Sequence, residues 1–285
     1  MFFRQRHLKL DKNVVVFTMH KAGSMVLHRV LKDVCDPHRI RYHSENQPEP
    51  DKLPVRKIFE GKDYIAKHNG CFGPIRFFLP SRALDTANIL LHLRDPRDVL
   101  TSMFYSYCFM HRGPVPANTG IRKEVADAGI DKFVLDMSSD EFMRYDGDYG
   151  TGGNYKEKIG HMVARYERYL REILVRPNAI LVSYEEMVLD FPSWLGKVVA
   201  RFELADNDEA YRFVAAARGA ETEKPLSEDV WSHKRKVTPG DHKEKLRPET
   251  IAELNRRFGG VLDALGYASG DYAASGIPQP AIHSA

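Results

Sequence analysis

The chain has 285 residues, of which 43% are hydrophobic and 28% are charged. This composition is typical of globular proteins and excludes disordered and fibrous classes. A chain of this length buries roughly three quarters of its unfolded surface, so it needs no disulfide or metal to hold its fold. The net charge is +3, from 42 basic and 39 acidic residues. We expect no nucleic-acid partner, because nucleic-acid-binding domains carry a larger basic excess.

The cysteines and the apolar segments indicate a cellular compartment. Cys35, Cys71 and Cys108 are odd in number and widely spaced, which argues against a disulfide framework and a zinc site. The longest apolar runs, such as residues 14–19, are far shorter than the ~20 residues of a membrane span. The charged first residues lead into no long apolar stretch, so we expect no signal peptide. These features predict a cytoplasmic protein without a membrane span.

The first predicted element is a strand over residues 14–19, a short β-branched run typical of strands buried on both faces. Residues 20–24 form a tight loop. The next apolar residues recur at the spacing of a buried helical stripe, at positions Leu27, Val30, Leu31 and Val34. The chain is therefore predicted to open as strand, loop and helix.

The following elements repeat this alternation. We predict a short strand at residues 64–67 and a stronger one at 87–93. A helix should start at Asp95 and Pro96, because aspartate is a favoured N-cap and proline a favoured first helical residue. The remaining predictions are a helix at 154–173, a strand at 179–183, and helices at 194–202, 209–217 and 248–265.

Strands that alternate with helices predict an α/β fold with a central parallel sheet flanked by helices. Residues 113–120 and 146–154 are rich in glycine and are predicted to be loops around a central insertion. Residues 270–285 consist mostly of small residues and prolines, and we expect a poorly ordered tail. No linker divides the rest, so we predict a single domain over residues 1–269.

The loop at residues 20–24 is a candidate anion site. Ligands of parallel sheets bind at the carboxyl ends of strands, and a helix N-terminus presents unpaired N–H groups there. Gly23 allows close approach, and Lys21 adds a full charge. The loop differs from the motif of nucleotide hydrolases, because its lysine precedes its only glycine and no Ser or Thr directly follows Lys21. The alternative is a plain strand-to-helix turn with a surface lysine.

A second candidate site begins at Arg94, where the strand at 87–93 ends. Asp98, Ser102 and Tyr105 share one face of the next helix. Arg94 could bind a phosphate through its planar guanidinium, with Ser102 supplying a hydroxyl. A nucleotide triphosphatase would place a magnesium-binding aspartate at this strand end, so a second phosphate fits better than a metal. The alternative is that Arg94 pairs with a nearby carboxylate.

Four segments, in order along the chain, resemble the sulfotransferases that use 3′-phosphoadenosine 5′-phosphosulfate (PAPS). Residues 20–24 resemble the family's 5′-phosphosulfate loop, and residues 94–102 resemble its 3′-phosphate motif. Residues 182–187, Val-Ser-Tyr-Glu-Glu-Met, are similar to its Tyr-Glu-Asp-Met segment. Residues 235–241, Arg-Lys-Val-Thr-Pro-Gly-Asp, are similar to its late Arg-Lys-Gly…Gly-Asp element. The resemblance implies a P-loop-like sulfotransferase fold.

The resemblance also implies the reaction. A sulfuryl group would move from PAPS, in line and without a metal, to a hydroxyl or less readily an amine. The acceptor would be a small molecule, a lipid or a carbohydrate. Lys21 would stabilise charge on the leaving phosphate, and His68 would be the base, since a neutral histidine can take the acceptor's proton.

The resemblance assigns the remaining binding residues in the same way. The 5′ end would be held by the backbone of Ala22, Gly23, Ser24 and Met25. The 3′-phosphate would be held by Arg94, Ser102, Arg235 and Lys236, and the adenine would lie near Tyr184.

Three positions depart from the family pattern. The family has tryptophan where this chain has Val26, which could cover the adenine only by apolar contact. The family's lysine two residues before the histidine is Ala66 here, and Lys67 would point to the opposite strand face. Val237 replaces a glycine of the late motif.

Two other functions stay open. One is a nucleotide-dependent kinase of P-loop-like fold. The other is a non-catalytic protein that binds 3′-phosphoadenosine nucleotides. The basic run at 233–236 would make binding of an anionic nucleotide salt-dependent in either case.

Overall fold

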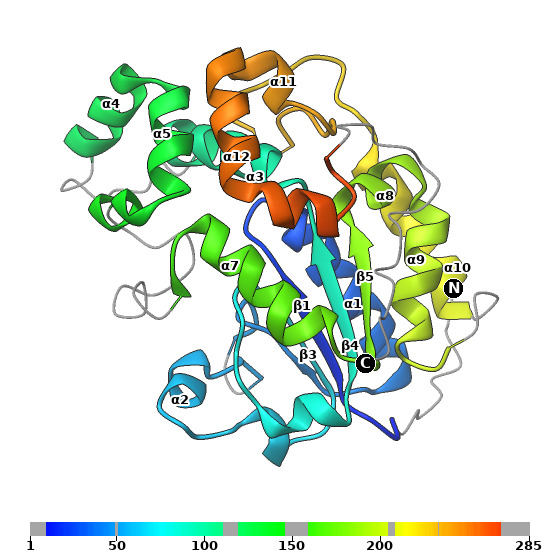
Figure 1. Cartoon of the computed structure of the whole chain (residues 1–285). Helices are drawn as coiled ribbons and strands as arrows, with labels where there is room; N and C mark the ends of the chain where they lie inside the picture. Colours follow the sequence, from blue (N-terminus) through cyan, green and yellow to red (C-terminus); the bar gives the residue numbers. More distant parts are fainter. Residues whose placement is uncertain are drawn as a thin grey trace. The chain divides into compact units, whose positions relative to one another are not determined.

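Strands between residues 14 and 183 form a five-stranded parallel sheet (Figure 1). Its strand order is β2-β3-β1-β4-β5. The strands are β1 (Val14–Thr18), β2 (Tyr42–His43), β3 (Cys71–Ile75), β4 (Asn88–Leu93) and β5 (Ala179–Ser183). The computed structural model describes residues 10–48, 51–110, 119–145, 159–204, 209–232 and 234–268. The predicted parallel sheet is therefore confirmed, with β1, β4 and β5 close to their predicted bounds.

The predicted strand at residues 64–67 is wrong. Ile65–Lys67 form a 3₁₀ turn, and the neighbour of β1 is β3, which begins at Cys71. The side-chain amide of Asn13 binds the carbonyl oxygens of Ile65 at 3.3 Å and His68 at 3.0 Å. These carbonyls therefore bind a side chain instead of a neighbouring strand. Glycine and proline inside β3 weaken its strand pattern in the sequence.

The chain folds as two compact units. The first comprises residues up to Leu93 and the segment from Arg171 to Thr222, and it contains the whole sheet. Its helices are α1 (Ser24–His38), α2 (Val55–Phe59), α8 (Tyr184–Leu189), α9 (Phe191–Ala200) and α10 (Glu209–Arg218). This unit also contains 3₁₀ turns at Arg82–Asp85, before β4, and at Gly219–Thr222, after α10.

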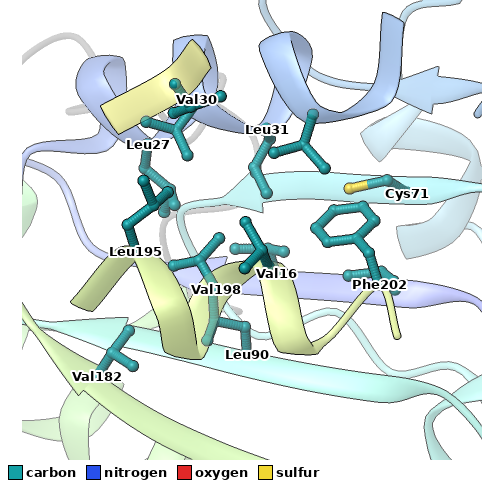
Figure 2. Packing of buried hydrophobic residues seen from close by; sticks show 14 of the residues in the cluster. Val16, Leu27, Val30, Leu31, Cys71, Leu90, Val182, Leu195, Val198 and Phe202 are labelled. Carbon is teal, nitrogen blue, oxygen red and sulfur yellow. The ribbon is translucent and has the colours of Figure 1, made fainter. Parts of the chain in front are cut away.

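The core of the first unit lies between the sheet and helices α1 and α9. Every residue of β1 is buried, as is the apolar stripe of α1 predicted from its helical spacing. Figure 2 shows side chains from the two helices meeting those of the strands, among them Leu27, Val30 and Leu31 of α1, Leu195 and Val198 of α9, and Val16, Leu90 and Val182 of the sheet. This packing fixes the end of β1 and the start of α1, between which the first candidate site lies.

The second unit is helical and comprises, among the described residues, parts of Arg94–Leu170 and of 223–268. Its helices are α3 (Pro96–Tyr105), α4 (Thr119–Ala128), α5 (Ile130–Met137), α7 (Met162–Tyr169), α11 (His242–Lys245) and α12 (Pro248–Ala264). The cap predicted for α3 is confirmed, because the Asp95 side chain accepts a hydrogen bond from the Arg97 amide. Ser106–Met110 and Leu170–Leu174 continue α3 and α7 as π-helical turns.

The central part of the chain differs from expectation in its helices. Helix α7 starts at Met162 rather than at residue 154, and the sequence did not predict α2, α4 or α5. The predicted loops at 113–120 and 146–154 lie almost wholly outside the described residues, as does the predicted tail at 270–285. Among the helices described, none has the length and apolar character needed to traverse a bilayer.

Candidate functional site

The loop between β1 and α1 presents a helix N-terminus at the carboxyl edge of the sheet. Gly23 caps α1 with a left-handed φ of 76°, a conformation that glycine adopts readily. Its carbonyl accepts the amides of Val26 at 3.0 Å and Leu27 at 3.1 Å. The N–H groups at the start of α1 precede these intrahelical bonds, and they are the groups that the sequence predicts to bind an anion.

Lys21 occupies the same loop in an unusual conformation. Its φ is 63°, in the left-handed region that costs a non-glycine residue about 1–2 kcal/mol. Such strain is concentrated at functional sites, where the surrounding structure holds it. The conformation of Lys21 therefore fits a binding loop better than a plain turn.

Tyr184 and Met187 of α8 pack directly on this loop. A Cβ on Gly23 would lie 2.7 Å from Met187 Cε and 3.1 Å from Tyr184 Cδ2. The structure thus brings Tyr184, the residue predicted to lie near the adenine, against the loop that contains Lys21. Val26 packs against the hydrophobic core, whereas Met25 is 46% exposed.

Arg76 is a charged residue of this site that sequence reasoning missed. It follows the last residue of β3, and its Nε donates to Ser24 Oγ at 3.3 Å. Its Nη1 donates to Glu45 Oε2 at 3.0 Å. The sequence feature that could have identified Arg76 is its position as the first charged residue after the apolar run of residues 71–75. Because that run was not predicted to be a strand, this feature was not used.

His68 does not join these residues. Its carbonyl binds Asn13, which precedes β1, so His68 lies at the amino edge of the sheet. Lys21 follows β1 at the opposite edge, and the five residues of β1 alone span about 16 Å. The His68 ring stacks on Tyr64, and its Nδ1 contacts the Tyr64 carbonyl at 2.9 Å. A base must lie within hydrogen-bond reach of its proton, so this geometry corrects the expectation that His68 acts with Lys21.

Ala66 and Lys67 lie in the 3₁₀ turn before His68. The expectation that Lys67 points to one face of a strand is therefore wrong. Lys67 is exposed at the amino edge of the sheet, away from the loop that contains Lys21.

The second candidate site lies in the second unit and begins at Arg94. Its Nη2 donates to Asp98 Oδ2 at 3.3 Å and to the Thr238 carbonyl at 3.5 Å. The hydroxyl of Tyr166 donates to the Arg94 carbonyl at 2.6 Å. The alternative that Arg94 pairs with a carboxylate is thus realised in the structure. The same contacts bring Arg94 to residues 235–241, as the two predicted 3′-phosphate segments require.

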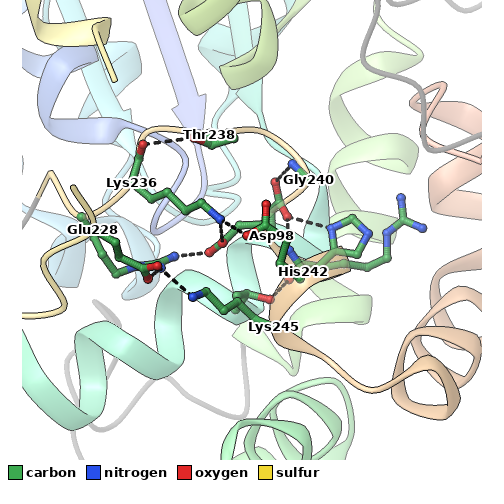
Figure 3. A network of polar contacts seen from close by, with 12 residues as sticks. Asp98, Glu228, Lys236, Thr238, Gly240, His242 and Lys245 are labelled. Carbon is green, nitrogen blue, oxygen red and sulfur yellow. Dashed lines mark hydrogen bonds and ion pairs between the residues drawn. The ribbon is translucent and has the colours of Figure 1, made fainter. Parts of the chain in front are cut away.

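Asp98 holds these two segments together (Figure 3). Its carboxylate accepts the Gly240 amide at 2.7 Å, the His242 amide at 2.9 Å and His242 Nδ1 at 2.7 Å. Burial would raise the pKa of Asp98, but Arg94 and the donors of His242 lower it well below its ordinary value. Asp98 is therefore an ionised residue that positions Arg94 and the late segment.

Arg235 and Lys236 lie in the same cluster, and carboxylates hold both. Arg235 pairs with Glu228 and Asp241, and its guanidinium stacks 4.1 Å from the centre of the Tyr105 ring. Lys236 donates to Asp241 at 3.0 Å and to Glu244 at 2.5 Å. Ser102 stands one helical turn from Asp98 and nearly one from Tyr105, so it shares the face of α3 that carries these contacts.

Val237, which stands where the family has a glycine, has a left-handed φ of 49°. We expect Val237→Gly to raise the free energy of unfolding by about 0.5–1 kcal/mol, because a β-branched residue is strained there and glycine is not. The melting temperature should rise by about 2 °C. Val237→Ala keeps a Cβ and should gain less. A glycine variant less stable than the alanine variant would contradict this account.

Comparisons with known proteins agree with this architecture. The family model of the sulfotransferase domain matches residues 11–266 and spans both units. A mouse sulfotransferase in complex with 3′-phosphoadenosine 5′-phosphate (PAP) has a similar fold, with a TM-score of 0.56 and 17% identity over 91% of this chain and 86% of that one. Retinol dehydratase with retinol and PAP is 14% identical, with a TM-score of 0.48 over 91% of this chain and 82% of that one.

No sequence among curated proteins matches the chain. The family match is the finding that decides, because it covers most of the chain and includes all four of the motif segments. The structural likeness, at low identity, supports the fold alone. The protein therefore belongs to the sulfotransferase family, whose members transfer a sulfuryl group from PAPS.

Proposed function

We propose that the protein transfers a sulfuryl group from PAPS to a hydroxyl of a small-molecule, lipid or carbohydrate acceptor. The observation that supports this most is the pair of candidate anion sites. One is the loop that follows β1, and the other starts at Arg94, the residue after β4. Each site follows a strand of the sheet and contains cationic side chains suited to a phosphate.

The loop of the first unit would hold the 5′-phosphosulfate. When bound, PAPS supplies the sulfuryl group and gathers negative charge on its 5′-phosphate as the bond to sulfur breaks. Lys21 and the N-terminus of α1 would stabilise that charge. The family has a lysine where this chain has Ala66. Arg76, which is bonded to Ser24, would supply a positive charge near the sulfuryl oxygens in place of that lysine.

The cluster of the second unit would hold the 3′-phosphate. Arg94 is 6% exposed and Arg235 7%, and charge-assisted bonds from such buried guanidinium groups are strong. Ser102 would add a hydroxyl donor. The residues fit a phosphate on one condition, that Arg235 and Lys236 exchange some of their bonds to Glu228, Asp241 and Glu244.

A thermal-shift titration with PAP tests this proposal. PAP at 100 times its dissociation constant should stabilise the protein by about 2.7 kcal/mol, whereas AMP, which lacks the 3′-phosphate, should shift it far less. A shift with magnesium-ATP but not with PAP would favour the kinase. A PAP shift without sulfated product from any hydroxyl acceptor would favour the non-catalytic binding protein.

A further inference from the structure

A carboxylate lies beside the predicted phosphosulfate loop and has no role in the reaction described so far. Glu45 follows β2 after one intervening residue, so it lies at the carboxyl edge of the sheet, as Lys21 does. Its Oε2 accepts Arg76 Nη1 at 3.0 Å, and Arg76 Nε donates to Ser24 Oγ at 3.3 Å. One guanidinium therefore separates the Glu45 carboxylate from the first residue of α1.

The reaction needs a proton acceptor at this edge, and His68 lies at the other. The two residues that follow Arg76, Phe77 and Phe78, are buried and cannot accept a proton. Glu45 can, because Oε2 is bound to Arg76 while Oε1 has no hydrogen-bond partner among the described residues. The Glu45 side chain is 15% exposed as a whole, but Oε1 itself is buried, so the oxygen that would accept the proton is shielded from solvent.

We propose that Glu45 is the general base of the sulfuryl transfer and that Arg76 positions its carboxylate. This assignment rests on the proposed function. The Glu45 carboxylate takes the proton of the acceptor hydroxyl while the acceptor oxygen forms its bond to sulfur. The bond from sulfur to the 5′-phosphate oxygen breaks, and its electron pair stays on PAP. The carboxylic acid then releases its proton to water.

The charged surroundings of Glu45 suit this role. Burial raises the pKa of Glu45 to about 7, although the nearby Arg76 and Lys52 lower it. Lys52 lies across a β-bridge from Ser44. From α1, His28 Nδ1 contacts Ser44 Oγ at 3.2 Å, and burial lowers the pKa of His28. A base whose pKa lies near the working pH is efficient, because it is ionised yet still binds a proton well.

The test compares Glu45→Gln with wild type, using PAPS and a panel of phenol, alkyl alcohol and sugar acceptors. We expect turnover to fall about 10²–10⁴-fold, the usual contribution of general base catalysis, while the PAP thermal shift is retained. The wild-type turnover should rise with pH to a plateau above about pH 7. The turnover of the variant should not show this rise. Glu249→Gln changes an exposed glutamate and is the matched control.

A second readout does not depend on turnover. Infrared difference spectra of the nucleotide-free protein should show a carboxylic acid that titrates with a midpoint near pH 7 and is missing in Glu45→Gln. His68→Ala separates the two assignments, because it should lower turnover only if His68 is the base.

Three results would overturn the assignment. They are turnover of Glu45→Gln within about twofold of wild type, loss of turnover in His68→Ala with PAP binding intact, and a Glu45 carboxyl that titrates below pH 5. Failure of the proposed function looks different. In that case wild type itself would form no sulfated product from any acceptor of the panel.

Discussion

Lys21→Ala should lower turnover about 10²–10³-fold, the effect of removing one preorganised group that stabilises developing charge. Negative charge gathers on the leaving phosphate oxygen in the transition state, and the ammonium of Lys21 would be the full positive charge within the loop. The stability of the fold should change little, because alanine and lysine are strained to a similar degree by the left-handed backbone at this position, where φ is 63°. Initial rates at saturating PAPS, together with the melting temperature, check both parts.

Lys67→Ala is the matched control for this variant. It removes the same charge from an exposed side chain at the opposite edge of the sheet, and it should change turnover little. Lys21→Arg replaces the ammonium with a planar guanidinium of the same charge, and it should retain part of the turnover. If Lys21→Ala and Lys67→Ala were equally active, Lys21 would have no role in stabilising the leaving group.

Asp98→Ala should lower the free energy of unfolding by about 3–5 kcal/mol, as expected when one partner of a buried ion pair is removed. The variant leaves Arg94 without its carboxylate, and the Gly240 and His242 donors lose their acceptor. The late segment would then lose its bonds to α3, so PAP affinity should fall as well. Urea unfolding and PAP titration measure the two effects.

The decrease in the free energy of unfolding at acidic pH gives an independent check on the role of Asp98. The pKa of Asp98 is lowered from its ordinary value of 3.8, so its contribution is present above pH 3.8 and is lost as the pH falls through the folded-state value. Asp98→Ala should therefore lose less stability than wild type over that acidic range. Asp127→Ala removes the partner of exposed Lys123 and should change stability by about 0–1 kcal/mol. An equally small effect of Asp98→Ala would contradict the role of Asp98 in holding α3 to the late segment.

Local patterns were sufficient to predict much of the fold. The β-branched run of β1 and the apolar stripe of α1 follow from burial, and the start of α3 follows from its Asp-Pro cap. Strand β3 was missed because Gly73 and Pro74 interrupt its pattern. A strand was predicted at 64–67, but those residues form a turn and the strand begins at Cys71, so His68 precedes β3.

Some residues of the candidate site could be predicted from local sequence patterns, and others could not. Arg94 and the late basic segment come together as expected, because the spacing along α3 places one face toward that segment. Arg76 and Glu45 could not be paired from the sequence, since they follow different strands and meet only when β2 lies beside β3. The left-handed φ of Val237 was not predicted from the sequence.

The four carboxylates of the second site affect how fast a nucleotide can arrive. Asp98, Glu228, Asp241 and Glu244 pair with Arg94, Arg235, Lys236 and Lys245. The four negative and four positive charges nearly cancel one another's field at long range, and electrostatic steering depends on an excess of one sign. The basic run at 233–236 alone predicts salt-dependent binding, but with Arg235 and Lys236 paired to carboxylates we expect the association rate of an anionic nucleotide with this cluster to depend little on ionic strength. The charges act only after contact, when phosphate oxygens replace carboxylate oxygens one by one.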